Sequence, residues 1–319
     1  MNLQGIATKP QPQVGPRTPA KTAQAVRFDS SPRISIGMPV YNGERWLEET
    51  LQSLRAQTLS DFELIISDNA STDATAAICA RHAAEDARIR YYRNARNIGA
   101  NRNYIAVVAH ARADYFKWAS SHDLCAPQFL EHCVAALEAD PDAVLAYPRT
   151  MVFADSLEQA ERYEKDISAM QESAAARFTH VLCNMKFVNP MNGVIRTRLL
   201  RRAHAMGSFS AADRVMLAEL ALLGKFVLVP EHLFFYRLNE ESTMHLKSRS
   251  EQERHFAPDA TSPLRWQHWK FQAALLRNAL VSAPLGPEKV AATIFAMKCI
   301  VWSRSQLMRD VTSAMGLRR

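Results

Sequence analysis

The feature that most constrains this chain is an apolar strand followed by a polar loop and an amphipathic helix, a unit that occurs twice in succession. In the first unit Ile34, Ile36 and Met38 alternate with smaller residues, PVYNG breaks the strand, and leucines recur at helical spacing through WLEETLQSLRAQ. In the second unit FELIISD is the strand, NASTD the loop and ATAAICARHAAE the helix, with Ser71 or Thr72 as its expected cap. Strands that alternate with helices predict an α/β fold, a mostly parallel, Rossmann-like sheet sandwiched by helices.

Two more strands, IRYYRN and DYFKWA, are followed by the polar loops NIGAN and SSHD. Because open α/β sheets bind ligands beyond the carboxyl ends of their strands, we expect PVYNG, SDNASTD and SSHD to converge on one cleft. Farther along, we expect a helical excursion over this cleft within residues 155–180 and a helix starting at residue 213. The segment KFVLVPEHLFFYR is expected to form a strand pair or a strand with an extension.

Composition divides the chain into three parts. Residues 1–31 are rich in Pro, Gln, Thr and Lys without periodicity, which predicts a disordered tail. Residues 32–246 hold the α/β pattern, and residues 247–319 form a C-terminal helical extension with helices expected over 264–281 and 288–309. Aromatic and aliphatic side chains alternate with Lys and Arg in the extension, so its helices either pack on the body or lie on a membrane surface.

The formal charge of +7 is concentrated at the two ends of the chain, and residues 247–319 alone hold 12 basic and 5 acidic side chains. The body between the ends is mildly acidic, which argues against a nucleic-acid groove there. The basic ends suit an anionic surface such as lipid head groups. Scattered Lys and Arg that only aid solubility are the alternative.

The five cysteines are odd in number and lack CxxC spacing, which argues against a disulfide framework or a zinc knuckle and favours a reducing compartment. No signal peptide is visible, and nowhere do ~18 consecutive apolar residues occur. We therefore expect a cytoplasmic protein, either soluble or peripheral at the inner face of the membrane.

Four fragments in this order, ISIGMPVYNGERWLEETLQSL, FELIISDNASTDAT, RNIGANRNY and YFKWASSHD, resemble the family 2 nucleotide-sugar glycosyltransferases of GT-A fold. The resemblance covers about residues 33–243. It implies inverting transfer of a sugar from a nucleoside diphosphate, usually UDP, to a hydroxyl of a saccharide or lipid-linked acceptor in bacterial surface polysaccharide or glycolipid synthesis. A non-catalytic sugar-nucleotide-binding protein of the same fold is the alternative. No GxGxxG follows the first strand, which argues against a dinucleotide-dependent oxidoreductase.

The resemblance places the nucleotide at the loops after the first strands, and the chemistry agrees. A carboxylate accepts from a base N–H, an aromatic ring stacks, and an arginine pairs with a diphosphate. The residues expected to bind the nucleotide sugar are Pro39, Val40, Tyr41, Asn42, Glu44, Asp68, Asn69, Asn97, Asn101, Arg102, Ser121, His122 and Arg237. The structural alternatives are turn and cap roles for Asp68, Asn69 and Glu44, an exposed Arg102, and an ion pair from Arg237 to Glu240 or Glu241.

The Asp-rich motif of the family reads Ser121-His122-Asp123 here, so only its last acid is present. The resemblance implies a divalent cation, Mn²⁺ or Mg²⁺, that offsets the charge of the departing diphosphate, with Asp123 as a ligand. His122 and His245 are further candidate ligands, since imidazole suits Mn²⁺ better than Mg²⁺. One carboxylate supplies few of the ligands that such a cation needs, so phosphate oxygens and water would have to supply most of them.

An inverting transfer needs a base that takes the acceptor hydroxyl proton, and the resemblance assigns this role to Asp213 at the start of a helix. The helix dipole should favour its ionised form, so that it acts by proximity more than by basicity. The alternative is that Asp213 is only the N-cap, in which case its removal costs about 1 kcal/mol of stability and little activity.

Overall fold

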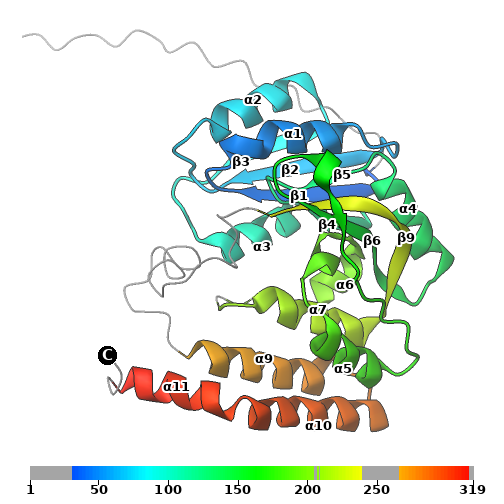
Figure 1. The fold of residues 1–319 in the computed structure, drawn as a ribbon, viewed down its shortest axis with the longest axis vertical. Helices are drawn as coiled ribbons and strands as arrows, with labels where there is room; N and C mark the ends of the chain where they lie inside the picture. Colours follow the sequence, from blue (N-terminus) through cyan, green and yellow to red (C-terminus); the bar gives the residue numbers. More distant parts are fainter. Residues whose placement is uncertain (1–30, 205–206, 208, 239–265, 316–319) are drawn as a thin grey trace, which may run out of the picture.

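The structure is a computed structural model that describes residues 31–204, 207, 209–238 and 266–315 (Figure 1). The predicted tail, apart from Ser31, lies outside the described residues, and so do His245, Glu240 and Glu241.

The strands are β1 (Ile34–Val40), β2 (Phe62–Asp68), β3 (Ile89–Arg93), β4 (Tyr115–Trp118), β5 (Leu124–Cys125), β6 (Ala143–Phe153), β7 (Glu161–Arg162), β8 (Val194–Arg196) and β9 (Lys225–Arg237). The helices are α1 (Glu44–Arg55), α2 (Thr75–Glu85), α3 (Ala100–His110), α4 (Phe129–Ala139), α5 (Ala174–Asn184), α6 (Thr197–Arg202), α7 (Ala212–Leu223), α9 (Gln267–Ser282), α10 (Pro287–Trp302) and α11 (Arg304–Ala314). Two 3₁₀ turns, η1 (Leu157–Gln159) and η2 (Asn189–Asn192), complete the described elements.

The strands form one nine-stranded sheet in the order β3-β2-β1-β4-β8-β6-β9-β5, with β7 paired to β6. The strands β3, β2, β1 and β4 are parallel to one another, and β8 runs antiparallel to both of its neighbours. The KFVLVPEHLFFYR segment is one long strand, β9, whose pairing with β6 is irregular near Pro230. The predicted Rossmann-like sheet is therefore confirmed, and its second half is mixed.

Helices cover both faces of the sheet, because alternate side chains of each strand point to opposite faces. On one face Leu64 and Ile66 belong to a core that includes side chains of α1, α2 and α4, and on the other Ile65 belongs to a core that includes side chains of α3, α5 and α7. Figure 1 shows α1 and α2 above the sheet and α3, α7 and the C-terminal helices below it. The expectation of a helical excursion over the cleft within residues 155–180 was wrong. This stretch begins with the 3₁₀ turn η1 and the short strand β7, and α5, which starts only at Ala174, packs on α7 and α10.

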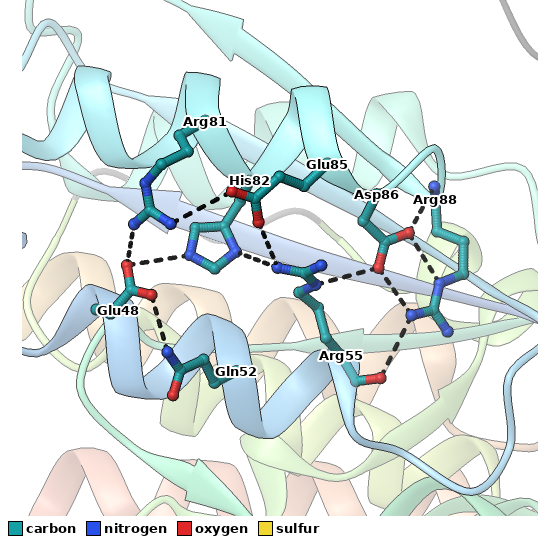
Figure 2. A network of polar contacts seen from close by, with 8 residues as sticks. All are labelled: Glu48, Gln52, Arg55, Arg81, His82, Glu85, Asp86 and Arg88. Atoms are coloured by element: carbon teal, nitrogen blue, oxygen red, sulfur yellow. Dashed lines mark hydrogen bonds and ion pairs between the residues drawn. The ribbon is translucent and has the colours of Figure 1, made fainter.

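A polar network fixes α2 onto α1 on the first face (Figure 2). At its centre the buried ring of His82 lies 3.1 Å from Glu48 Oε2 and 3.1 Å from Arg55 Nη1. Hydrogen bonds from His82, Arg81 and Gln52 lower the pKa of Glu48 to about 2. The network lies between helix faces, away from the loops that follow the strands, so its role is to hold the two helices together.

The C-terminal extension has three described helices where the sequence predicted two. The chain bends at Ser303, whose hydroxyl accepts a hydrogen bond of 2.9 Å from Gln272 Nε2 on α9. Beyond Ser303, α11 lies along α9, where Leu307 is buried. On α9, Leu275 and Ala279 are buried in the core beside α7, so this helix packs on the body.

Candidate active site

The loops that follow β1 and β4 touch each other at the carboxyl edge of the sheet. Val40 pairs with Asp68, so β1 and β2 end at the same level, and the Ala119 N–H donates to the Gly37 carbonyl. A Cβ on Gly43 would lie 2.9 Å from Val40 Cγ2 and 3.0 Å from Ser121 Oγ. Only glycine therefore permits this approach, which brings PVYNG and SSHD together as predicted.

The helices α1 and α2 cap each other where they begin. Glu44 Oε2 accepts the Ala74 N–H at 2.7 Å, and Asp73 Oδ2 accepts the Glu44 N–H at 3.1 Å. Burial raises the pKa of Asp73, but hydrogen bonds from Thr75 and from the Glu44 N–H outweigh it and lower the pKa. Glu44 thus has the capping role that the sequence left open.

The prediction that Ser71 or Thr72 caps α2 was wrong. The Ser71 hydroxyl accepts the N–H of Asn42 at 3.0 Å, and Thr72 donates its N–H to Asn42 Oδ1 at 2.9 Å. Ser71 and Thr72 therefore bind the loop after β1, a tertiary partner that the local sequence does not indicate. Glu44 satisfies the helix terminus instead.

Asp68 is fully buried, and both of its carboxylate oxygens have partners within the protein. Oδ1 accepts the Ser71 N–H at 2.8 Å, and Oδ2 accepts the Tyr91 hydroxyl at 2.8 Å and lies 3.5 Å from Arg93 Nε. The carboxylate therefore stabilises the loop after β2. This is the turn role that was the structural alternative for Asp68.

Three asparagines connect the loops around the site. Asn69 Nδ2 donates to Asn97 Oδ1 at 2.8 Å, and Asn97 Oδ1 also accepts the N–H of Gly99, whose φ of 86° is the left-handed value that favours glycine. Asn101 Nδ2 donates to the carbonyl of Gly207 at 2.5 Å, so it joins α3 to the segment before α7. In this arrangement the three amides bind protein groups and position the loops.

Two of the predicted ligands reach solvent with their reactive ends. The Tyr41 side chain is 49% exposed, and Arg102 is exposed at the start of α3. Next to Tyr41, Asn42 has a φ of 49°, and Ala211, just before α7, has a φ of 60°. Such values cost a non-glycine residue about 1 kcal/mol or more and tend to gather at binding and catalytic loops.

Asp123 is almost fully buried and is held by the end of β9. Its Oδ1 accepts the Arg237 N–H at 2.9 Å, and its Oδ2 accepts the Ser120 hydroxyl at 2.7 Å. His122 lies beside it, with Nε2 3.9 Å from Asp123 Oδ1 and its ring edge-on to Trp46. Each carboxylate oxygen accepts one of these two hydrogen bonds from the described residues, which leaves it a second lone pair.

The Arg237 guanidinium is buried and occupied by the protein. It donates to the carbonyls of His122 and Ala154, forms an ion pair with Glu49 and lies over the ring of Phe153. The ion-pair partner is thus a residue of α1, whereas Glu240 and Glu241, the partners held open by the sequence, lie outside the described residues. This geometry makes Arg237 a positioning residue for the Asp123 loop.

Asp213 lies in the first turn of α7, whose N-cap is Ala211 and not Asp213. Burial raises the pKa of Asp213, and the N–H bond and charge of Arg214 only partly oppose this effect. The expectation that the helix terminus would favour the ionised form was wrong, because removal from water outweighs the dipole here. A raised pKa makes this carboxylate a stronger base.

Tyr104 on α3 is a further candidate residue that sequence reasoning missed. Its pKa is raised by burial and by the negative charges of Asp123 and Asp213, with a smaller contribution from Tyr236. Both acids are therefore within electrostatic range of this one phenol. A tyrosine within NRNY, just after the NIGAN loop, was the available signal.

The fit of a divalent cation to this site is partial. Among the described residues, no group of three or more His, Cys, Asp or Glu side chains is placed to hold a metal ion. Asp123 has lone pairs left for one, and the His122 ring lies next to it. The residues present would hold a cation only together with oxygens of a bound diphosphate and water.

The fold and the loops define an α/β protein of GT-A type with a loop-lined site at the carboxyl edge of its parallel strands. The family model described as Glycosyl transferase family 2 matches residues 35–204, more than half of the chain. The chain therefore belongs to glycosyl transferase family 2, as its four fragments indicated.

Two curated relatives match the first part of the chain. EpsE of Bacillus subtilis is 38% identical over 114 residues, which are 35% of this chain and 40% of EpsE. The abequosyltransferase RfbV of Salmonella typhimurium is 37% identical over 115 residues, which are 35% of this chain and 34% of RfbV. The match thus spans well under two thirds of either relative.

Two solved structures share the fold. TarS of S. aureus, residues 1–349 in complex with UDP, superposes with a TM-score of 0.61 at 14% identity, covering 86% of this chain and 73% of that one. The mannosyltransferase PcManGT of Pyrobaculum calidifontis, in complex with GDP-Man and Mn²⁺, gives a TM-score of 0.50 at 14% identity, covering 91% and 82%.

Proposed function

We propose that this protein is an inverting glycosyltransferase that moves a sugar from a nucleoside diphosphate to an acceptor hydroxyl. The observation that carries the proposal is the joining of the loops at the carboxyl edge of the sheet, where Gly43 lies against Ser121 and Asn101 binds the Gly207 carbonyl. These loops lead into Asp123 and Asp213, the acids that donor binding and acceptor activation require. The charges of both acids raise the pKa of Tyr104, which supports one reaction centre.

In this mechanism Asp213 takes the proton of the acceptor hydroxyl while its oxygen attacks the anomeric carbon from the face opposite the diphosphate. The half-buried setting that raises the Asp213 pKa favours this proton transfer. Tyr41 stacks on the base of the donor, and Arg102 approaches the diphosphate, since both side chains are exposed at the rim. Asp68, Asn69, Asn97 and Asn101 support these loops, and Arg237 holds the Asp123 loop.

We propose UDP as the carrier and Mn²⁺ or Mg²⁺ as the cation. TarS binds UDP and UDP-GlcNAc, and PcManGT binds GDP-Man with Mn²⁺, which supports a sugar nucleotide without choosing its base. When bound, the cation would neutralise charge on the diphosphate, with Asp123 as its protein ligand and His122 beside it. His245 remains a proposed ligand outside the described residues.

The acceptor that we propose is a saccharide or lipid-linked saccharide of bacterial surface polysaccharide or glycolipid synthesis. The name of RfbV, an abequosyltransferase, supports the transfer of a sugar, and the acceptor class is part of the proposal. We also propose that the protein works as a peripheral protein at an anionic membrane. No helix within the described parts of the chain is long and apolar enough to cross a membrane.

The test is a panel of nucleotide sugars, with thermal stabilisation and release of nucleoside diphosphate measured for each, with and without Mn²⁺. The proposal expects one donor to stabilise the protein and to be turned over. If a donor stabilises the protein but is not turned over with any of the acceptors tested, the result would favour the non-catalytic sugar-nucleotide-binding protein. No response to any member of the panel, together with stabilisation by NAD, would refute both readings.

A further inference from the structure

The helix α10 buries its small residues and exposes its large apolar residues, which is the reverse of a helix that only packs on a protein core. Its buried residues are the small Ala292 and Ala296, whereas Val290 and Val301 are each 59% exposed. Ile294 and Met297 lie between them at 44% and 47%. The four large side chains are spaced by four, three and four residues, so they form one stripe along the outer face.

Further exposed apolar side chains flank the stripe at both ends of α10. Leu285, in the turn before the helix, is 83% exposed, and Trp302 at its end is 61% exposed. Met308 on α11 adds a further exposed apolar side chain. Figure 1 shows α10 and α11 at the end of the molecule remote from α1 and α2. We call the set Leu285, Val290, Ile294, Met297, Val301, Trp302 and Met308 the outer apolar face. Contiguous exposed apolar surface of this kind marks an interaction site.

The charges around the outer apolar face are basic. Both acids of residues 266–315 are engaged on the inner side: Glu288 accepts the Ala175 N–H at 2.7 Å, and Asp310 accepts the His268 N–H at 2.9 Å. The basic residues of the same range are Lys270, Arg277, Lys289, Lys298, Arg304 and Arg309. Lys298, Arg304 and Arg309 are exposed beside the apolar stripe. Two copies of such a surface repel each other, whereas anionic lipid head groups attract it.

We infer that the outer apolar face docks on an anionic lipid bilayer. The helix has 16 residues, about 24 Å at 1.5 Å per residue, and would lie in the plane of the head groups with its apolar stripe toward the acyl chains. The nearby Lys and Arg side chains would extend to the phosphates. This inference rests on the membrane association proposed under the function and identifies the surface that makes it. The residues of this surface lie outside the candidate active site.

The docked surface is connected to the rim of the active site. Gln267 Oε1 at the start of α9 accepts the Ser210 N–H at 3.0 Å, and Asn101 binds the Gly207 carbonyl in the same segment. The segment leads directly into α7 and Asp213. A bilayer under α10 would therefore hold the acceptor side of the site at a fixed distance from the lipid surface.

The test is flotation of the full chain with vesicles of mixed phosphatidylglycerol and phosphatidylcholine, and with pure phosphatidylcholine vesicles, in the absence of any donor. We expect flotation with the mixed vesicles, little with the neutral ones, and loss on adding salt. Ile294→Ser/Met297→Ser/Val301→Ser should reduce the bound fraction at least about tenfold. The matched control is Leu157→Ser/Met170→Ser, which changes two similarly exposed apolar side chains elsewhere and should bind like the original chain.

A second variant, Lys298→Glu/Arg304→Glu/Arg309→Glu, touches no packed side chain and should weaken binding roughly fivefold or more for each charge removed. Equal flotation of the apolar variant and the original chain would overturn the inference. The inference would also be overturned if the original chain sedimented as a dimer, the apolar variant did not, and neither bound vesicles. The outer apolar face would then bind a second copy of the chain. Thermal stabilisation by nucleotide sugars, measured on the same variants, reports on the proposed reaction separately.

Discussion

The change Asp213→Asn separates a catalytic base from a residue that only stabilises the first turn of α7, because the two roles predict opposite combinations of rate and stability. The amide keeps the size of the side chain and its hydrogen-bond acceptor for the Arg214 N–H, which lies 2.7 Å from Oδ1. It removes the charge and the ability to take a proton. General-base catalysis contributes about 10²- to 10⁴-fold, so kcat should fall by that factor while donor binding persists.

Stability should not fall. The folded-state pKa of Asp213 is raised by burial, so ionisation is less favourable in the folded chain than in the unfolded one. A carboxyl of this kind costs stability once the pH rises above its unfolded value, and the cost is complete above the folded pKa. At neutral pH the asparagine removes this cost, so the free energy of unfolding should stay the same or rise. Loss of the favourable helix dipole, about 0.3 to 1 kcal/mol, is already included in the net direction of the shift.

The assay is release of nucleoside diphosphate from the donor that the panel identifies, over a pH series, with urea unfolding followed in parallel. In the original chain the rate should increase with pH through the Asp213 pKa, and the variant should lack this limb. Asp61→Asn, an exposed acid before β2, is the control and should leave both quantities unchanged. A variant rate near that of the original chain, with unfolding free energy lower by about 1 kcal/mol, would show that Asp213 is a structural residue of the helix terminus.

Three further changes test one ion pair of the sheet and two supports of the site. Glu63→Gln should lower the unfolding free energy by about 2 to 3 kcal/mol, less than the about 3 to 5 kcal/mol of a fully enclosed pair, because its partners Arg90 and Arg112 reach solvent. Burial raises the Glu63 pKa, but hydrogen bonds from Arg112 and its other partners lower it more. The stabilisation by Glu63 is therefore complete above its unfolded-state pKa and is lost as the pH falls through its folded-state pKa. Acid titration of unfolding should show this loss in the original chain and not in the variant. Arg237→Met should cost about 2 to 4 kcal/mol in urea unfolding and weaken donor binding, since it removes the bonds to His122 and Ala154; unchanged donor affinity would exclude the positioning role. Glu44→Ala should cost about 1 kcal/mol through the lost bond to Ala74 and leave donor affinity unchanged in calorimetry, and a large loss of affinity would make Glu44 a ligand after all.

The elements of the first half could be predicted because their signals are local. Alternation in ISIGMPV and helical spacing in the segment after it depend on residues a few positions apart, and the structure confirms β1, α1, β2 and α2. The family followed from short fragments in order. The extension was harder, because the bend at Ser303 depends on a contact with Gln272 on another helix.

The site shows the same division between local and tertiary information. The sequence by itself determined which polar loops follow which strands, and therefore that they meet at one edge of a parallel sheet. Only the tertiary structure decided the state of each side chain: Asp68 and Arg237 are occupied by protein partners, Asp213 is desolvated, and Tyr104 lies near two distant acids. Hydrogen-bond partners and burial depend on groups far apart in the chain, and no local pattern specifies which group fills the space beside a given carboxylate.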